Sequence, residues 1–245
     1  MNDLRRIFSR NADGGLIWKW EYYFDIYERH LSRFRNTDAH VVEVGVYQGG
    51  SLGMWREYFG DRATIHGVDI NPRCKEFESL GVRIHIGSQE DRAFLRTLRA
   101  EIPRIDVLID DGGHTMKQQK TTFEELYPHL SNRGIYICED LHTSYSPRYG
   151  GGYRRRGSFI EYSKHLIDGL NAWFAHEWSR LKVSEFTSTT DSLHYYAGML
   201  VIEKRPVSRP HVVRTGKMKI VEGHQIAPTN LSSRIGDALK KIRRS

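Results

Sequence analysis

The sequence is poor in cysteine and proline and contains no long hydrophobic run. Its 245 residues include seven prolines and two cysteines, Cys74 and Cys138. Two isolated thiols exclude a disulfide framework and a cysteine metal site, and they favour a reducing compartment. No apolar run approaches the roughly 20 residues of a membrane span, and the first residues lack the apolar core of a secretory signal. We therefore expect a cytoplasmic protein that does not associate with membranes.

The charge of the chain is moderately basic. The formal net charge is +7, and 27% of the residues are charged. Basic residues gather at 154–156 and in the C-terminal third of the chain. Such a patch could bind nucleic acid, but no helix-turn-helix, zinc-finger or RNA-recognition signature accompanies it. A solvated tail or a patch for an acidic partner is therefore the simpler interpretation.

The most informative segment is 41–51, where an apolar run ends in a turn rich in glycine. A helix-compatible segment follows the turn, and a second apolar run ends on Asp69. This order of strand, glycine turn, helix, strand and acid is typical of a Rossmann-like sheet that binds a nucleoside. The glycines allow close approach of the backbone to the ligand, and the acid accepts hydrogen bonds from ribose hydroxyls.

The spacing of the glycines and the acid Glu43 narrow the choice of cofactor. Gly45, Gly49 and Gly50 follow a Gly-x-x-x-Gly-Gly pattern rather than the dinucleotide pattern Gly-x-Gly-x-x-Gly. A carboxylate within the first strand suits a cofactor with a cationic end, and S-adenosylmethionine carries a sulfonium and an ammonium. Ser88 could instead serve only as a helix N-cap. The candidate cofactor-binding residues are Glu43, Gly45, Tyr47, Gly49, Ser51, Asp69, Ile70, Ser88, Gln89 and Asp110.

Strand and helix patterns alternate through the centre of the chain. The predicted strands are 41–45, 64–69, 82–87, 105–110 and 134–138, and the predicted helices are 51–59, 72–80, 90–100 and 116–127. This alternation predicts an α/β fold with a mostly parallel, Rossmann-like sheet and helices on both faces. Further along, we expect a helix at 158–176 and strands at 182–187 and 195–203, the last of them antiparallel.

The sequence suggests three parts. Residues 1–38 are rich in aromatic side chains and contain a predicted helix at 19–34. Residues 39–204 form the main domain, and residues 205–245 form a basic extension. Within the main domain, the loop 143–157 is long and rich in glycine, tyrosine and arginine. Long loops in compact domains are often functional, so we expect a lid that contacts the substrate through Tyr145, Tyr149 and Tyr153.

Acidic pairs follow two predicted strands, Asp110 and Asp111 after one and Glu139 and Asp140 after the next. Helix caps and surface salt bridges would explain one such pair. Four carboxylates at adjacent strand ends repel one another unless a positive charge lies among them. Mg²⁺, which prefers oxygen ligands, would supply that charge.

Two histidines lie close to these acidic pairs. His114 follows Asp111 by three residues, and His142 follows Asp140 by two. Either imidazole could remove a proton from a substrate hydroxyl near the metal. We take His114 as the catalytic base, with His142 as a competing base or as a residue that supports a metal ligand.

The segments 43–51, 67–72, 109–114 and 139–145 together resemble class I S-adenosylmethionine-dependent methyltransferases. The subgroup they resemble comprises the metal-dependent sugar O-methyltransferases of macrolide biosynthesis, of the mycinamicin type. The resemblance extends from about residue 18 to residue 204. It implies that Asp111, Glu139 and Asp140 bind the metal and that His114 is the base.

These observations predict a Mg²⁺-dependent O-methyltransferase that uses S-adenosylmethionine and acts on a hydroxyl of a sugar or glycosylated metabolite. One alternative is the same chemistry on a catechol-like small molecule. Another is a non-catalytic protein of this fold that binds nucleic acid or another ligand. The expected partner is a small-molecule acceptor rather than nucleic acid or a membrane, and a homo-oligomer remains open.

Overall fold

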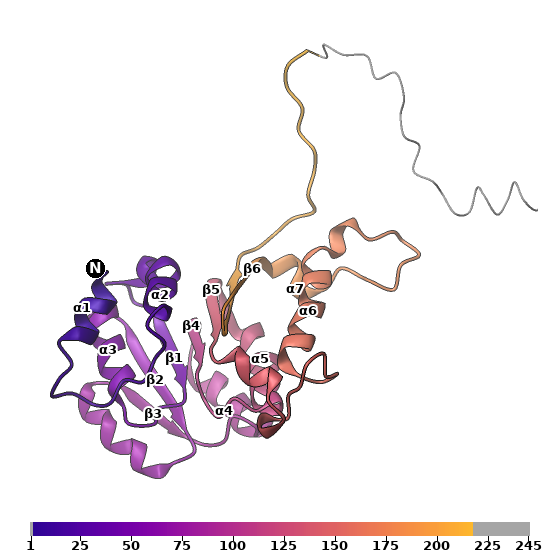
Figure 1. Cartoon of the computed structure of the whole chain (residues 1–245). Helices are drawn as coiled ribbons and strands as arrows, with labels where there is room; N and C mark the ends of the chain where they lie inside the picture. The colour runs from indigo at the N-terminus through magenta and orange to yellow at the C-terminus, as the bar shows by residue number, and fades with distance from the viewer. Residues whose placement is uncertain (1, 218–245) are drawn as a thin grey trace, which may run out of the picture. The chain divides into compact units, whose positions relative to one another are not determined.

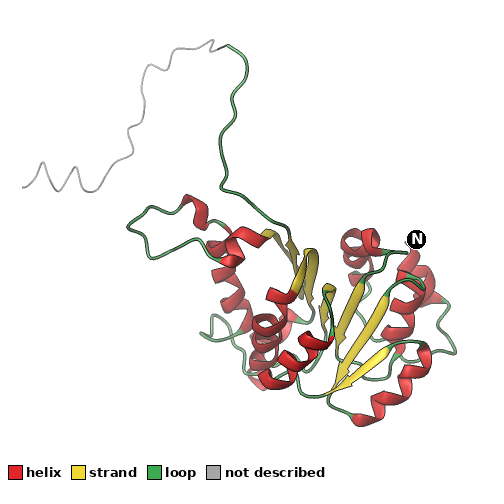
Figure 2. Cartoon of the chain, turned by 180° about the vertical axis from the view of Figure 1, so that it is seen from behind, coloured by secondary structure: helices red, strands yellow, loops and turns green. Residues whose placement is uncertain are grey.

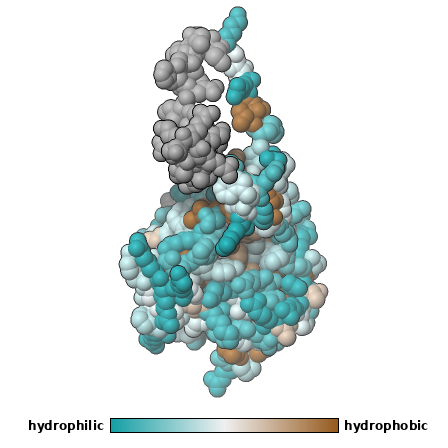
Figure 3. All heavy atoms as spheres, turned by 90° about the vertical axis from the view of Figure 1, so that its right-hand side faces the viewer, coloured by the Kyte–Doolittle hydropathy of each residue, from teal (hydrophilic) through white to brown (hydrophobic). Residues whose placement is uncertain are grey.

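The computed structural model describes residues 2–217, and residues up to Arg209 form one compact unit. The predicted basic extension 205–245 lies mostly outside the described residues, so it stays a prediction, as does the three-part division of the chain. The face of the molecule in Figure 3 is mainly hydrophilic. Between residues 2 and 217, no helix combines the length and apolar character that a membrane span requires.

A seven-stranded sheet forms the centre of the compact unit (Figure 1). Its order is β3-β2-β1-β4-β5-β7-β6. The first five strands are parallel, whereas β7 is antiparallel to both of its neighbours, as predicted for the last strand. The strands are β1 (His40–Val44), β2 (Thr64–Asp69), β3 (Arg83–Ile86), β4 (Ile105–Asp110), β5 (Leu130–Cys138), β6 (Thr190–Tyr196) and β7 (Met199–Lys204).

Helices cover both faces of the sheet (Figure 2). The α-helices are α1 (Asp3–Ser9), α2 (Tyr23–Leu31), α3 (Gly50–Phe59), α4 (Arg92–Glu101), α5 (Met116–Leu126), α6 (Phe159–Leu170) and α7 (Glu185–Thr189). Buried side chains of α1, α2 and α3 pack on one face, and those of α4, α5 and α6 pack on the other. The Rossmann-like architecture predicted from the alternating pattern is therefore confirmed.

The apolar pattern of the strands explains both cores. Val41 of β1 packs with α1, α2 and α3, whereas Val42 and Val44 pack against the opposite face. Each strand of a sheet covered on two sides reads as a continuous apolar run, because alternate side chains enter different cores.

Local caps then set where the helices begin. Thr115 and Gln118 form a capping box at α5, and Asp91 accepts hydrogen bonds at the start of α4.

Three predicted elements differ from the structure in their limits or in their type. The helix predicted at 19–34 begins only at Tyr23 and ends at Leu31, where a 3₁₀ turn follows, and residues 18–20 line a cavity instead. The segment Pro72–Leu80 is a 3₁₀ helix, and Gly81 ends it with a left-handed backbone, as expected from the glycine. Strand β5 begins at Leu130, so Gly134 lies within the strand rather than at its start.

The largest errors concern residues 158–204. The predicted helix 158–176 ends at Leu170, and a 3₁₀ turn, Ala172–Phe174, follows it. The predicted strand 182–187 is wrong, because Ser184 caps a short helix, α7. The strand predicted at 195–203 is two strands, β6 and β7, that pair across a tight turn at Gly198. Gly198 has a positive φ of 70°, which a tight turn between antiparallel strands favours.

A row of three histidines, one from each of β1, β2 and β3, lies away from this region. The rings of His40, His66 and His85 stack with centroid separations of 5.6 and 5.3 Å. His66 is the central ring, and only 1% of its surface is exposed. Burial, followed by the charge of its two histidine neighbours, lowers the pKa of His66 to about 3. The folded protein therefore keeps His66 neutral at any pH near neutrality.

This shift predicts that acid destabilises the fold through His66. The unfolded chain takes up a proton below about pH 6.5, whereas the folded chain does so only near pH 3. The contribution is therefore fully present above pH 6.5 and is lost as the pH falls toward 3. We expect His66 to account for about 1.4 kcal/mol of the stability lost between pH 7.5 and pH 5.5.

Urea unfolding at the two pH values measures this loss. The His66→Phe variant keeps a ring in the core and should lose less stability than the wild type between them. His176→Asn, which changes an exposed histidine, should match the wild-type loss. An equal loss in the wild type and in His66→Phe would exclude His66 as the source.

Candidate active site

A cavity of about 800 Å³ opens at the carboxyl ends of β1, β2, β4 and β5. The loops that follow β1 to β5 line it, and the segment 18–23 closes one side. Ligands of open α/β sheets bind at this end of the strands. The glycine turn after β1, Asp69 at the end of β2 and the acidic segments after β4 and β5 therefore meet in this cavity.

The glycine turn after β1 depends on Gly45 and Asp69. Gly45 has a φ of 98°, and a Cβ atom there would collide with the carbonyl oxygen of Asp111. The Asp69 carboxylate accepts hydrogen bonds from the backbone N–H groups of Val46 and Tyr47, at 2.9 and 3.1 Å. Its other oxygen accepts from Asn71 N at 2.8 Å. Asp69 thus holds the turn in shape and still has lone pairs toward the cavity.

Six of the ten predicted cofactor-binding residues line the cavity, namely Gly45, Tyr47, Asp69, Ile70, Ser88 and Gln89. The other four lie outside its lining. Gly49 has a positive φ at the start of α3, where a Cβ atom would collide with the ring of Phe77. Glu43 is fully buried and accepts hydrogen bonds from Ser51 Oγ and Trp55 Nε1, at 2.7 and 2.9 Å. The carboxylate of Glu43 therefore binds groups within the protein and does not face the cavity, where a cofactor would lie.

Asp110 lies beneath the cavity rather than in its wall. It accepts hydrogen bonds from Gln89 Nε2 at 3.0 Å and from Tyr136 OH at 3.3 Å. Burial raises its pKa to about 7. Gln89 also accepts a hydrogen bond from Gly113 N at 2.7 Å. These contacts tie the loop after β3 to the loop after β4, so Asp110 positions the wall that carries Asp111.

Lys19 lies at the centre of a buried group of carboxylates. Its Nζ atom is 2.5 Å from Asp111 Oδ2, 3.0 Å from both oxygens of Glu139, and 3.6 Å from Glu43 Oε1. Only 3% of its side chain is exposed. Burial alone would lower the pKa of Lys19, but the three carboxylates raise it instead. One ammonium is therefore shared by three carboxyl groups, of which Glu43 and Glu139 are buried.

Glu139 has different partners from Asp140, the other acid that follows β5. Tyr27 OH donates to its Oε1 atom at 2.6 Å, in addition to the contacts of Lys19. Burial and the negative charge of Asp111 raise the pKa of Glu139 well above its usual range. Both carboxylate oxygens of Glu139 thus have a partner within the protein.

The remaining two acids face His114. Asp111, His114 and Asp140 each offer one ligand atom, and these atoms lie within 4.8 Å of one another. His114 Nε2 is 4.0 Å from Asp111 Oδ1 and 3.7 Å from Asp140 Oδ2. The other ring nitrogen of His114 is buried and has no hydrogen-bond partner among residues 2–217. Two carboxylates with free oxygens fit a hard divalent cation.

The predicted metal-binding triad is therefore divided in the structure. Asp111 and Asp140 meet at His114, whereas Glu139 faces Lys19 and Tyr27. His142 lies at the rim of the cavity, with its Nδ1 atom 3.8 Å from Asp140 Oδ1. Its side chain is 54% exposed, compared with 19% for His114. This arrangement places His114 inside the acidic group and His142 at its edge.

Strained backbone marks the same cavity. Tyr47, His114 and Asp140 have positive φ values of 50°, 56° and 53°, and all three line the cavity. Non-glycine residues rarely adopt this conformation, and such strain gathers at functional sites. The Thr143 hydroxyl lies 3.1 Å from His114 O and 2.8 Å from Asp140 O, so it fixes both turns.

The loop 143–157 is only partly a wall of the cavity. It contains two short 3₁₀ turns, one ending at Tyr145 and one at Pro147–Tyr149. Tyr149 lines the cavity, but Tyr145 and Tyr153 do not. Tyr153 is 77% exposed, and its ring packs against Arg154. Of the three tyrosines predicted to contact the substrate, the structure brings only Tyr149 to the site.

For residues 1–38 the sequence favoured an aromatic helix that packs on the sheet, with a secondary share in the wall of the substrate site, and it assigned no role to Lys19. Trp20 Nε1 and Tyr23 OH each donate to Asp140 Oδ1 at 3.3 Å, and the exposed ring of Trp18 stands at the cavity. A lysine between two tryptophans was the available signal. It was not decisive, because nothing local indicates that this segment reaches strand ends more than 90 residues away in the sequence.

Comparison with known proteins identifies relatives of this chain. Residues 42–141 match a family model described as a methyltransferase domain. A Streptomyces olivaceus 8-demethyl-8-(2-methoxy-α-L-rhamnosyl)-tetracenomycin-C 3′-O-methyltransferase is 38% identical over 82% of this chain and 54% of its own length. Demethylmacrocin O-methyltransferase of Streptomyces fradiae is 32% identical over 83% of this chain and 53% of its own. The chain thus spans about half the length of these relatives.

A solved structure is also similar. The MycE methyltransferase of the mycinamycin biosynthetic pathway, crystallised with Mg, S-adenosylhomocysteine and mycinamycin VI, superimposes with a TM-score of 0.77. It is 26% identical, and the match covers 97% of this chain and 59% of that one. The mostly parallel sheet with its antiparallel β7 is consistent with this match. This chain therefore carries a class I methyltransferase domain and resembles the macrolide sugar O-methyltransferases of the mycinamicin type.

Proposed function

We propose that this protein is an S-adenosylmethionine- and Mg²⁺-dependent O-methyltransferase that acts on a sugar hydroxyl of a glycosylated small molecule. The observation that carries the proposal is the convergence of Asp111, His114 and Asp140 on the cavity that the glycine turn also lines. The names of two relatives, which are O-methyltransferases of rhamnosyl tetracenomycins, support the sugar acceptor.

Each side of the cavity has a distinct task in this proposal. Gly45, Tyr47 and Asp69 would hold the nucleoside of S-adenosylmethionine, which supplies the methyl group. Asp111 and Asp140 would hold Mg²⁺, which would supply positive charge and make a nearby acceptor hydroxyl more acidic. Glu139 would contribute through Lys19 and Tyr27 rather than as a direct ligand.

The protein's own groups then prepare the acceptor. Nε2 of His114 faces the two aspartates, so it can take the proton of a hydroxyl placed between them and the cofactor. Trp18 and Trp20 present exposed ring surface at the open side, which suits the apolar face of a sugar. Because the reacting groups are held together, positioning supplies much of the rate.

A transfer assay with labelled S-adenosylmethionine tests this proposal. We expect methyl transfer to a rhamnosylated acceptor, complete loss in excess EDTA, and recovery on addition of Mg²⁺. Its control is the same acceptor without the sugar, which should not react. A catechol should also fail, because the proposed acceptor is a sugar. Full activity in EDTA, or transfer only to the catechol, would contradict the proposal.

Calorimetry tests the assignment of the cofactor separately from the transfer assay. S-adenosylhomocysteine should bind the wild type, and Asp69→Ala should bind it more weakly, because this change removes the ribose acceptor and loosens the turn. Glu76→Ala, which removes an exposed carboxylate that does not line the cavity, is the control and should leave binding unchanged. No binding of S-adenosylhomocysteine by the wild type would exclude the assignment.

A further inference from the structure

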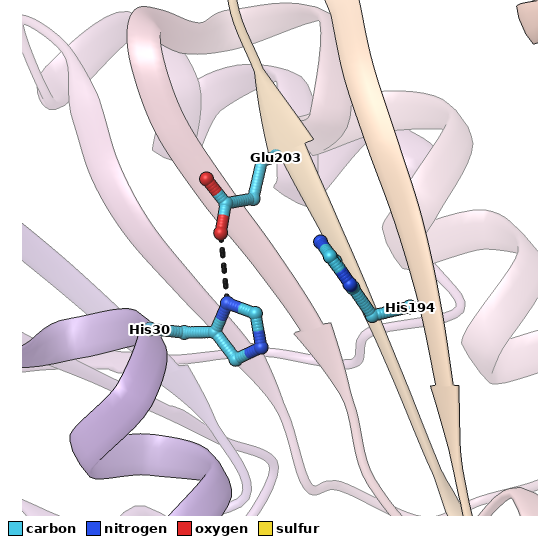
Figure 4. A group of neighbouring side chains, drawn as sticks. All are labelled: His30, His194 and Glu203. Atoms are coloured by element: carbon cyan, nitrogen blue, oxygen red, sulfur yellow. Dashed lines mark hydrogen bonds and ion pairs between the residues drawn. The ribbon is translucent and has the colours of Figure 1, made fainter.

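A second cluster of metal-ligating side chains lies outside the cavity. His30 of α2, His194 of β6 and Glu203 of β7 point toward one another (Figure 4). One ligand atom from each lies within 4.8 Å of the other two. His30 Nδ1 is 2.7 Å from Glu203 Oε1, and the two imidazole rings are 4.9 Å apart. None of the three residues lines the methyltransferase cavity.

The other polar atoms of these side chains have partners of their own. His30 Nε2 is 2.9 Å from Tyr196 OH, and His194 Nε2 is 3.0 Å from Ser192 Oγ. Arg33 donates to Glu203 Oε2 at 2.8 Å. Ligands of protein metal sites commonly show this arrangement, in which an outer hydrogen bond orients the side chain and leaves another atom for the ion.

The protonation states also suit a cation. Burial lowers the pKa of His30, so its ring is neutral at neutral pH. Burial would raise the pKa of Glu203, but its hydrogen bonds with Arg33 and His30 outweigh that effect and lower it. A neutral imidazole and an ionised carboxylate are the forms that bind metals.

We propose that His30, His194 and Glu203 form a binding site for a divalent transition metal such as Zn²⁺. Two imidazoles and one carboxylate are a zinc ligand set, whereas Mg²⁺ prefers oxygen ligands alone. Water would complete the coordination. On binding at Nδ1, the proton of His30 moves to Nε2 and is donated to Tyr196, so no proton is lost. The guanidinium of Arg33, and that of Arg29 beyond Tyr196, reduce the affinity without blocking the site.

Such an ion would join α2 to the β6–β7 hairpin. Helix α2 carries Tyr23 and Tyr27, which contact Asp140 and Glu139 in the active site. His30 lies seven residues after Tyr23, about 10 Å along the helix. Binding at His30 therefore fixes one end of the helix whose other end supports the acidic group, and it should stabilise the folded protein.

Titration with Co²⁺ in excess Mg²⁺ tests the site in the full chain, because Mg²⁺ occupies the oxygen ligands of the active site. We expect visible ligand-field absorption that saturates at one Co²⁺ per chain. His194→Ala removes a half-exposed ligand and should weaken Co²⁺ binding at least about 10-fold, the loss seen even for outer partners of a metal. His114→Asn, in the active-site group, should bind Co²⁺ as the wild type does.

Melting temperatures give a second readout that does not depend on absorption. Zn²⁺ should raise the melting temperature of the wild type and of His176→Ala, a change at a distant exposed histidine, but not that of His194→Ala. The proposal is overturned if the wild type shows no Co²⁺ absorption under excess Mg²⁺. It is equally overturned if the signal survives in His194→Ala or disappears in His114→Asn. These outcomes do not depend on methyl transfer, so they are distinct from failure of the proposed function.

Discussion

Replacing His114 with asparagine is expected to lower kcat by about 10²–10⁴-fold, the usual effect of losing a general base. Asparagine tolerates the left-handed backbone that His114 adopts, with φ at 56°, so the turn should keep its shape. It cannot take the acceptor proton. KM should change much less, because Asp111 and Asp140 remain in place. Steady-state kinetics with a saturating cofactor measures both constants.

The matched control is His142→Asn, since His142 also lies next to Asp140 but at the exposed rim. We expect a smaller fall in kcat, because its Nδ1 atom faces only Asp140. Binding of S-adenosylhomocysteine should be unchanged in both variants. An inactive His142→Asn together with an active His114→Asn would assign the base to His142 and contradict our assignment.

Replacing Lys19 with methionine is expected to destabilise the fold by about 3–5 kcal/mol, the cost of removing one partner from a buried ionic group. Methionine has nearly the same length and volume, so packing around the position is retained. The change leaves Glu43, Asp111 and Glu139 without their ammonium. Urea unfolding in EDTA, at neutral pH, measures the free energy of unfolding without a contribution from added metal.

Lys117→Met provides the comparison for this experiment. Lys117 pairs with Glu90 on the surface, where its side chain is 72% exposed. Exposed pairs contribute at most about 1 kcal/mol, so this variant should remain close to the wild type. If Lys19→Met were no less stable than Lys117→Met, the ammonium of Lys19 would not hold the carboxylates together.

Local sequence patterns predicted the central sheet well. The runs that became β1, β2 and β4 have strong apolar character and are bounded by glycine or acidic residues, so their limits were predicted to within one residue. The C-terminal part was harder. Ser184 and Thr187 form a helix cap within a segment that also reads as a strand, and local propensity does not separate these alternatives.

The candidate site shows the same division. The order of glycine turn and acidic pairs was sufficient to predict that Asp69, Asp111 and Asp140 meet at one edge, because the carboxyl ends of parallel strands share it. Proximity in a motif did not predict orientation. Glu139 and Asp140 are neighbours in the sequence, yet the left-handed backbone at Asp140 turns the two carboxylates toward different partners.

The sequence by itself therefore determined the fold class, the nucleoside-binding edge and the residues from which the chemistry is built, since these depend on local periodicity and strand order. Only the tertiary structure decided which carboxylates face His114 and which pair with Lys19. Lys19, Tyr27 and His30 reach the sheet from a segment whose own pattern indicates no more than an aromatic helix. Their contacts span more than 90 residues of sequence, and such contacts arise from packing, which no local signal encodes.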